Sequence, residues 1–183
     1  KISIDSATMM NKVFEIIEAH KIFNISYKKL KILIHPRSYV HAIIKFNAGM
    51  IKVIAHETNM KIPIHNSIYS PIMKFLKTKK IDIIKLNNLN FSNVDYEKFP
   101  LVKIISNLTE KNSLFETVIV ATNDELVKKF LNKKINFLDI SNKMMKFLSL
   151  NDFKKYKYIK ADSIDKIIKL NSYVRLKINN LGI

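Results

Sequence analysis

Residues 1–20 read KISIDSATMMNKVFEIIEAH and combine a helical apolar pattern with a dense group of polar side chains. The segment opens with a short apolar alternation, Ile2 and Ile4, and we expect a helix from about Ala7 to Phe23. Polar side chains gather where this helix starts. They are Asp5, Ser6, Thr8, Asn11, Lys12 and Glu15.

Helical spacing separates two faces of this segment. The face that we expect to be buried consists of Met10, Val13, Phe14 and Ile17. The polar stripe consists of Thr8, Asn11, Lys12, Glu15 and Glu18. Asp5 or Ser6 is placed to cap the helix, since short polar side chains are favoured at that position.

The polar residues at the helix start suit a phosphate. Free N–H groups and the helix dipole favour an anion there. Lys12 would add a charge, Ser6 and Asn11 would add hydrogen-bond donors, and Glu15 could hold a divalent cation by its oxygens. The alternative is a capped surface helix with a Lys12–Glu15 pair worth a few tenths of a kcal/mol. Residue types alone favour this alternative, because such caps are common.

The formal net charge of +17 invites a nucleic-acid partner, but the basic residues are unlike such a surface. Arg37 and Arg175 are the only arginines among the 32 basic residues. The charge is also spread out, +6 over residues 1–70 and +11 over residues 71–183. Phosphate contacts favour clustered arginines, so we expect no nucleic-acid partner. An abundance of Lys, Ile, Asn, Phe and Tyr is typical of an AT-rich coding sequence.

Several classes of protein are disfavoured by what the sequence lacks. No run approaches the ~18 apolar residues of a membrane span, so we expect no membrane partner. There is no cysteine, which favours an intracellular location. We expect a cytoplasmic protein, with a plastid-type organelle as the alternative. Gly49 and Gly182 are the only glycines, so neither a dinucleotide-binding loop nor a P-loop can be built from this sequence.

Along the chain we expect an α+β fold: a mixed α/β part with a small sheet, then a linker, then a helical bundle. Residues 1–70 carry three predicted strands, and the last two flank a turn at Asn47-Ala48-Gly49. These strands are Lys31–His35, Tyr39–Phe46 and Met50–His56. Residues 71–99 are expected to be a linker with one short strand at Ile81–Leu86.

Residues 100–183 show helical spacing, which predicts a small bundle. The first helix follows Pro100, and a second covers Leu126–Leu131. The third begins after Asp139 as its N-cap, and the fourth after Asp162 or Ser163. The apolar stripe of the first helix is Leu101, Ile104, Ile105 and Leu108.

The five histidines lie in residues 1–70 and do not form a zinc motif. His35 and His41 are six residues apart on neighbouring predicted strands. The segment from His56 to Met60 is similar to H-E-x-x-H, but Met60 replaces the second histidine. Structural or surface roles are therefore the default for these side chains.

One longer match changes the balance between the two interpretations of the helix start. KISIDSATMMNK followed by Glu15 resembles the signature of the 1-deoxy-D-xylulose 5-phosphate reductoisomerase family. Further segments resemble that family in the same order. They are IEAHKIFN, ILIHPRSYVH, NMKIPI, FPLVKI and ATNDEL. The resemblance implies a catalytic domain at 1–70, a linker at 71–99 and a C-terminal helical domain at 100–183, without the family's NADPH-binding domain.

The resemblance also implies an activity and its site residues. The family rearranges a ketose phosphate and reduces the resulting aldehyde with NADPH, using Mg²⁺, Mn²⁺ or Co²⁺, in non-mevalonate isoprenoid biosynthesis. Carried over by motif, Ser6, Asn11 and Lys12 bind the substrate phosphate end, and Glu15 binds metal and substrate. His41 would line the pocket as a catalytic residue, and Met60 would lie toward the nicotinamide of NADPH. The family forms homodimers, so a homodimer is expected.

The sequence departs from the family pattern at four positions. Val13 stands in place of Gly, Asn59 in place of Asp, Ser70 in place of Trp, and Asp124 in place of Glu. The family's other two metal ligands are expected upstream of residue 1. Two alternatives stay open at this point: a basic nucleic-acid-binding module, and an inactive remnant that serves only for dimerisation.

Overall fold

The computed structural model describes residues 1–69 and 74–180, and its contacts divide the chain into two compact units. The helical unit comprises Lys1–Ile32 and Asp95–Ile183, and the hairpin unit is Leu33–Val94. The contacts therefore group residues 1–32 with the C-terminal helices. The predicted boundaries, in contrast, separate residues 1–70 from residues 100–183.

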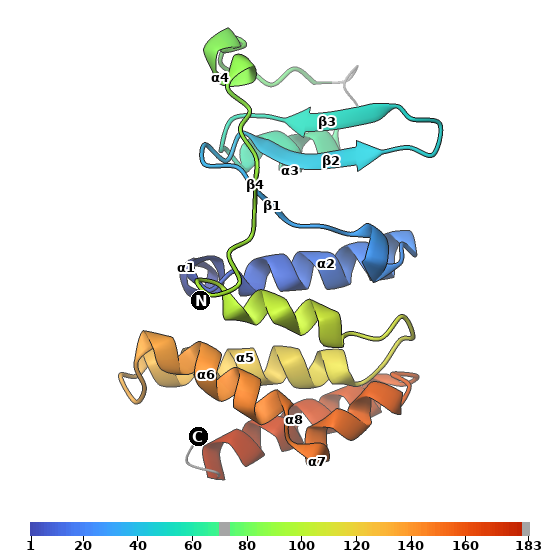
Figure 1. Ribbon diagram of the computed structural model, residues 1–183, viewed down its shortest axis with the longest axis vertical. Helices are drawn as coiled ribbons and strands as arrows, with labels where there is room; N and C mark the ends of the chain where they lie inside the picture. Colours follow the sequence, from blue (N-terminus) through green and yellow to red (C-terminus); the bar gives the residue numbers. More distant parts are fainter. Residues whose placement is uncertain (70–73, 181–183) are drawn as a thin grey trace. The chain divides into compact units, whose positions relative to one another are not determined.

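In residues 1–32 and 95–180 the helical unit contains helices and loops, with one isolated bridge between Ser113 and Lys160. Its α5 packs against both α6 and α8, and α2 lies along the 3₁₀ helix η2 (Figure 1). In chain order the elements are α1 (Ile2–Ala7), α2 (Met10–Phe23), η1 (Tyr27–Lys29), η2 (Pro100–Asn107), α5 (Phe115–Leu131), α6 (Phe137–Leu148), α7 (Asn151–Lys154), η3 (Lys155–Tyr158) and α8 (Ile164–Asn180).

A single apolar core holds these helices together. It draws on α2, η2, α5, α6, α7 and α8, so residues 1–32 and 95–180 share one core. The fully buried side chains include Met10, Val13, Ile119, Phe147 and Val174. The predicted buried face of α2 is confirmed for Met10 and Val13, while Phe14 and Ile17 are partly buried against the same core. Burial of this kind is the main source of helix stability in a globular domain.

The N-terminal segment differs from the single helix that the sequence predicts. It forms α1 and α2, with a break at Met9, whose φ of 58° and ψ of 18° are left-handed. The Thr8 hydroxyl donates a 3.0 Å hydrogen bond to the Ile4 carbonyl, which holds the end of α1. The predicted cap by Asp5 or Ser6 is wrong, because both residues lie inside α1.

The C-terminal helices follow the prediction with local differences. The stripe after Pro100 is confirmed, but η2 is a 3₁₀ helix. The second helix, α5, is longer than predicted and starts at Phe115. Asp139 is not the N-cap of α6: Asn136 is, and Asp139 accepts a 2.8 Å hydrogen bond from the Asn136 N–H in a capping box.

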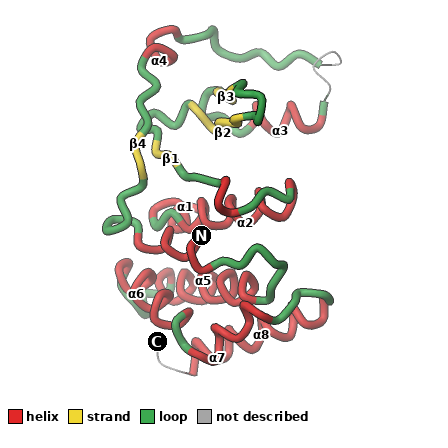
Figure 2. The backbone as a smooth tube through the Cα atoms, turned by 45° about the vertical axis from the view of Figure 1, so that its right-hand side comes forward, coloured by secondary structure: helices red, strands yellow, loops and turns green. Residues whose placement is uncertain are grey.

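The hairpin unit contains two small antiparallel sheets and two short helices (Figure 2). Strand β1 pairs with β4, and β2 pairs with β3 across the predicted turn, where Gly49 has a φ of 88°. In chain order the elements are β1 (Leu33–Ile34), β2 (Val40–Lys45), β3 (Ile51–Ala55), α3 (Lys61–Ile68), α4 (Ile83–Asn87) and β4 (Ser92–Asn93).

One strand prediction in this unit is wrong. The sequence predicts a strand at Ile81–Leu86, but Ile83–Asn87 form the helix α4. The Asp82 side chain accepts a 3.1 Å hydrogen bond from the Lys85 N–H, so Asp82 acts as an N-cap. The predicted α+β class is confirmed by the combination of a helical unit and small antiparallel sheets. Within residues 1–69 and 74–180, no helix is long and apolar enough to cross a membrane.

Candidate active site

The junction between α1 and α2 carries four of the predicted site residues. Ser6 is exposed on α1, and Asn11, Lys12 and Glu15 lie on the first turns of α2. The Met9 N–H donates to the Ser6 carbonyl at 3.2 Å, so the break itself fixes the backbone of Ser6 against the start of α2. The four residues thus share one short, bent segment.

Lys12 and Glu15 form an ion pair on the surface of α2. The Lys12 Nζ lies 2.7 Å from Glu15 Oε2 and 3.0 Å from Oε1. Both side chains are well exposed, 41% for Lys12 and 53% for Glu15. A pair of this kind on a helix is worth about 0.3–0.5 kcal/mol. The predicted surface pair is therefore present, and a phosphate or a cation could separate the two side chains at little cost.

Asn11 supplies an unsatisfied polar atom at the same place. Its Oδ1 is buried and has no hydrogen-bond partner. A buried acceptor without a donor costs about 1–3 kcal/mol, and such atoms are rare in folded proteins. Because the atom has almost no accessible surface, a ligand hydroxyl could bond to it only after the Asn11 side chain moves. Asn123 Oδ1, in the residue that supports the junction, and His35 Nε2 are also buried and unpaired among the described residues.

A buried contact with α5 supports the junction from below. The Asn123 Nδ2 donates a 2.8 Å hydrogen bond to Asp5 Oδ1, and both residues are buried. Asp5 directly precedes Ser6 in the chain, so α5 fixes the backbone on which Ser6 stands. The sequence alone did not indicate this role for Asp5, because its partner is 118 residues away. The polar residues of the ATNDEL segment are the one feature of the sequence that points to a polar partner for Asp5.

The residues after Asn123 continue this polar contact to α8. Asp124 Oδ2 accepts a 2.7 Å hydrogen bond from Arg175 Nη2, and Glu125 Oε1 accepts one of 3.0 Å from Asn179 Nδ2. Asp124 also pairs with the Lys1 ammonium. The departure from Glu to Asp at this position therefore retains an anion with two cationic partners.

The other departures from the family pattern have structural places as well. Val13 is fully buried in the core beneath the junction. Asn59 Oδ1 accepts a 3.0 Å hydrogen bond from the Lys61 N–H at the start of α3. Ser70 lies outside the described residues.

His41 and Met60 belong to the hairpin unit. The His41 ring stacks on the His56 ring with centroids 3.6 Å apart, and its Nε2 lies 3.1 Å from the His56 carbonyl oxygen. His41 lies at an irregularity in the pairing of β2 and β3, between Val40 and Ala42. Met60 stands just before α3 and is 68% exposed. An exposed thioether at this place can contact a ligand without any rearrangement of a core.

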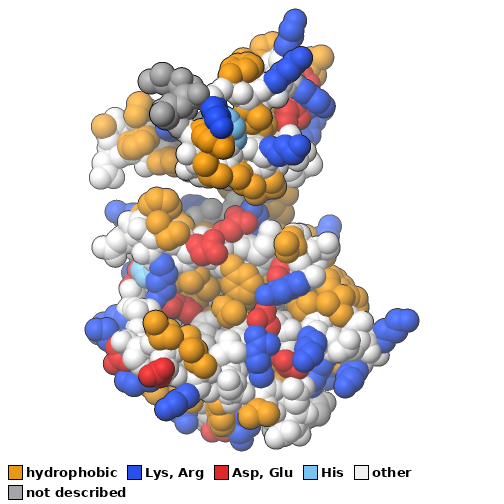
Figure 3. Space-filling model, turned by 180° about the vertical axis from the view of Figure 1, so that it is seen from behind, with side chains coloured by type: hydrophobic (Ala, Val, Ile, Leu, Met, Phe, Trp, Pro, Cys, Tyr) orange, Lys and Arg blue, Asp and Glu red, His pale blue; other side chains and the backbone are white. Residues whose placement is uncertain are grey.

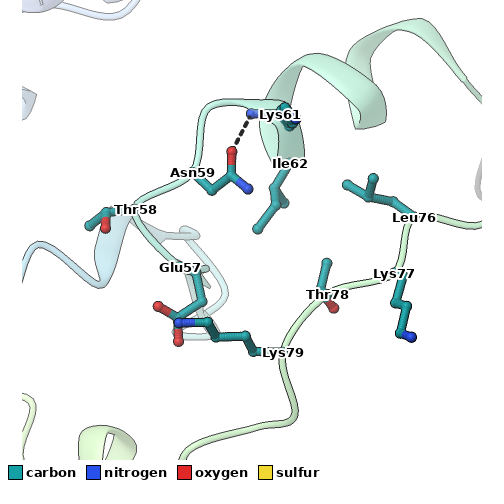
Figure 4. Close-up of a pocket in the computed structure, with 9 residues that line it drawn as sticks. All are labelled: Glu57, Thr58, Asn59, Lys61, Ile62, Leu76, Lys77, Thr78 and Lys79. Carbon is teal, nitrogen blue, oxygen red and sulfur yellow. Dashed lines mark hydrogen bonds between the residues drawn. The ribbon is translucent and has the colours of Figure 1, made fainter.

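A cavity of about 480 Å³ in the hairpin unit is lined by the chain neighbours of Met60 but not by Met60 itself. Figure 4 shows the residues on both sides of Met60 facing the segment from Leu76 to Lys79 across this cavity. Lys61, Lys77 and Lys79 give its lining a positive charge. Glu57, also in the lining, pairs with Lys85 at 2.9 Å. Hydrogen bonding to Glu57 is the main reason that the pKa of Lys85 is raised.

At the junction, Glu15 could supply one ligand of a divalent-metal site. The Glu15 carboxylate is exposed, and Mg²⁺ and Mn²⁺ prefer such oxygen ligands. Within the part of the chain that the structure describes, no three His, Asp or Glu side chains are grouped to hold a metal ion. The sequence, with two glycines, contains no loop that fits the phosphates of NADPH.

Comparisons with known proteins place this junction in a family. Residues 56–177 match the model of the DXP reductoisomerase C-terminal domain. Residues 1–23, which include the junction, match the model of the 1-deoxy-D-xylulose 5-phosphate reductoisomerase C-terminal domain. The chain therefore belongs to the 1-deoxy-D-xylulose 5-phosphate reductoisomerase family.

Individual relatives support the same assignment. The reductoisomerase of Pelagibacter ubique (strain HTCC1062) is 58% identical over 183 residues, which is 100% of this chain and 47% of that protein. The reductoisomerase of Sulfurihydrogenibium sp. (strain YO3AOP1) is 39% identical over 167 residues, 91% of this chain and 43% of that protein. The chain thus spans about half the length of the curated relatives that it matches.

Two solved structures share the fold. The reductoisomerase from Zymomonas mobilis, in complex with NADPH, matches with a TM-score of 0.82 and 32% identity over 100% of this chain and 47% of that one. A DOX-P reductoisomerase with fosmidomycin and magnesium matches with a TM-score of 0.84 and 28% identity over 99% of this chain and 47% of that one.

Proposed function

We propose that the chain is the C-terminal part of a reductoisomerase that converts 1-deoxy-D-xylulose 5-phosphate to 2-C-methyl-D-erythritol 4-phosphate with NADPH and a divalent metal. Family membership supports the reaction class. The observation that carries the proposal to this chain is the junction of α1 and α2. At this junction Lys12 and Glu15 form a weak ion pair, and the Asn11 Oδ1 acceptor has no hydrogen-bond partner.

In this proposal the junction binds the substrate phosphate end. Lys12 attracts the phosphate by charge, and Ser6 and Asn11 donate hydrogen bonds from the hydroxyl and the amide. Asn11 Oδ1 is buried, so a movement of the amide would have to uncover it before it could accept from a substrate hydroxyl. Binding energy from the phosphate, which does not react, can hold the ketose in position for rearrangement.

Glu15 is proposed to serve the reacting end of the substrate. It would hold Mg²⁺, Mn²⁺ or Co²⁺ together with ligands outside this chain. Such a cation supplies Lewis-acid stabilisation of negative charge on the substrate oxygens. The proposal gives Glu15 a second role as a direct substrate contact. It separates from Lys12 when substrate arrives, at the small cost of a surface pair.

The roles of His41 and Met60 are proposals of the same kind. Stacking and the contact with the His56 carbonyl restrict the orientation of the His41 ring, which supports a part in lining the pocket. The exposure of Met60 supports a contact with the nicotinamide. NADPH itself would be bound mainly by residues outside this chain. The assignment of residues 1–70 as the catalytic domain is likewise a proposal.

The proposal extends to partners and location. A homodimer in the cytoplasm is expected from the resemblance, and light scattering of the complete protein would measure its oligomeric state. Lys and Arg side chains are interspersed with other residues on the face shown in Figure 3. That distribution supports the proposal of a small-molecule enzyme over a nucleic-acid-binding module.

The direct experiment is steady-state kinetics of Lys12→Ala in the complete enzyme. We expect KM to rise about 10–100-fold, because a charged hydrogen bond worth roughly 1.5–3 kcal/mol is lost. The metal concentration that gives half-maximal activity should change little. Lys28→Ala, at an exposed lysine of η1, is the matched control and should leave KM unchanged. A KM for Lys12→Ala within twofold of the wild type would contradict the phosphate role.

A further inference from the structure

The helical unit contains a second concave feature that the proposed function does not use. It is a cavity of about 210 Å³ formed by η2, α5, α6, α7 and η3, and we name it the η3 cavity. None of the residues at the α1–α2 junction contributes to it. Its lining consists of Ile104, Asn107, Phe115, Met145, Leu148, Ser149, Lys154 and Lys157.

One side of the η3 cavity is apolar and well ordered by the core. Ile104, Phe115 and Leu148 are buried, with exposed fractions of 1%, 2% and 7%. Met145 is half-buried and packs against the same core. Its flexible thioether can adapt to a ligand of irregular shape. This floor favours a short hydrocarbon chain.

The other side of the cavity is positively charged. The Lys157 Nζ lies 4.9 Å from the centroid of the Phe115 ring and donates a 3.2 Å hydrogen bond to Asn107 Oδ1. Burial, and then the nearby charge of Lys154, lower the pKa of Lys157. Lys154 and Lys157 line the same cavity, so two like charges face one ligand-sized space.

Among the described residues, no carboxylate pairs with either of these two charges. The lining contains neither Asp nor Glu. Over residues 1–69 and 74–180, neither Lys154 nor Lys157 has an ion pair with an acidic side chain. A partly desolvated cation beside a like charge is unfavourable, and an anion between the two would offset both effects. The charge arrangement thus favours an anionic ligand.

We propose that the η3 cavity binds a small amphiphilic anion, a short apolar chain that ends in a carboxylate or a phosphate group. The chain lies on Phe115 and Leu148, and the head group lies between Lys154 and Lys157. At ~30 Å³ per water, the space corresponds to about seven non-hydrogen atoms, the size of valerate. We expect a dissociation constant of about 0.1–1 mM, which lies between the values that the best and the ordinary ligand efficiencies give for seven atoms.

Binding can be measured by methyl NMR of the methionines of the 183-residue chain. The Met145 resonance, assigned with a Met145→Leu variant, is the reporter, and the fully buried Met144 outside the lining is the internal control. Valerate should shift the Met145 resonance saturably, with a dissociation constant near 1 mM. Butyl phosphate tests whether a phosphate head group binds as the carboxylate does. Acetate lacks the chain and valeramide lacks the charge, so each should bind at least tenfold more weakly.

A charge variant tests the role assigned to the lysine. Lys157→Gln should weaken valerate binding about tenfold, since one charged contact is lost. Lys103→Gln makes the same change of net charge at an exposed residue of η2 and should bind valerate as the wild type does. The proposal would be overturned if valerate and valeramide bound equally well, or if both variants lost the same valerate affinity. It would also be overturned if neither anion shifted the Met145 resonance saturably.

Discussion

The two units of the chain bury their apolar residues to very different extents. In the helical unit one core draws on helices from both ends of the chain and contains many fully buried side chains. In the hairpin unit, Val94 is the only buried residue among those described. Strands β2 and β3 are rich in Ile and Val, yet no residue of either strand is buried.

This difference in burial predicts a difference in stability between the two units. A two-stranded hairpin without a core is marginally stable by itself in water. A helical unit with a continuous core can fix the positions of side chains at its surface. The α1–α2 junction lies on that unit, with Val13 and Asn123 buried beneath it. A rigid support of this kind is what a substrate-binding site requires.

The largest effect should come from the core of the helical unit. Phe147 is fully buried and stacks on Phe153 with ring centroids 4.2 Å apart. Phe147→Ala should lower the free energy of unfolding by about 3–5 kcal/mol, because it leaves a cavity in a packed core. Urea unfolding followed by helical circular dichroism measures this value. A loss below about 1 kcal/mol would mean that the core is not continuous.

An intermediate effect is expected at the contact that supports the junction. Asn123→Ala removes the donor to Asp5 and should cost about 1–3 kcal/mol, since the buried carboxylate loses a partner. Hydrogen exchange should become faster in α1 in particular. A double-mutant cycle with Asp5→Ala should give a non-additive result if the contact is direct. Additive losses would contradict the direct coupling of α1 to α5.

The parts of this fold that the sequence predicts are those with local signals. The turn at Gly49 and the helix start after Ser163 have such signals, and both are found in the structure. The break at Met9 could not be predicted, because the sequence there continues a good helical pattern. Asp5 was misassigned as a cap because its partner, Asn123, is distant in the sequence.

The candidate site was predicted by a different route. Composition and spacing alone favoured a surface pair of Lys12 and Glu15, and that pair is present. The resemblance to a family, and not the pattern of charges, separated the two interpretations. The unsatisfied Asn11 Oδ1 is visible only in the structure, since it depends on how the amide packs.

The smallest effect is expected in the hairpin unit. Ile44 in β2 is 41% exposed, so Ile44→Ala should change the free energy of unfolding of the 183-residue chain by less than about 0.5 kcal/mol. Amides of β2 and β3 should also exchange faster than those of α5 by mass spectrometry. Protection in β2 equal to that in α5 would contradict the contrast between the units.

The central claim, that the α1–α2 junction is a catalytic site, is tested most directly through Glu15. The measurement is the kinetics of Glu15→Gln in the complete enzyme over a range of Mg²⁺ or Mn²⁺ concentrations. The substitution keeps the size of the side chain and removes its charge. We expect kcat to fall by at least about 100-fold and the metal concentration for half-activity to rise. Glu18→Gln, one turn further along α2 and also exposed, should behave as the wild type. Wild-type kcat and metal dependence for Glu15→Gln would contradict the account and leave the junction as a surface ion pair.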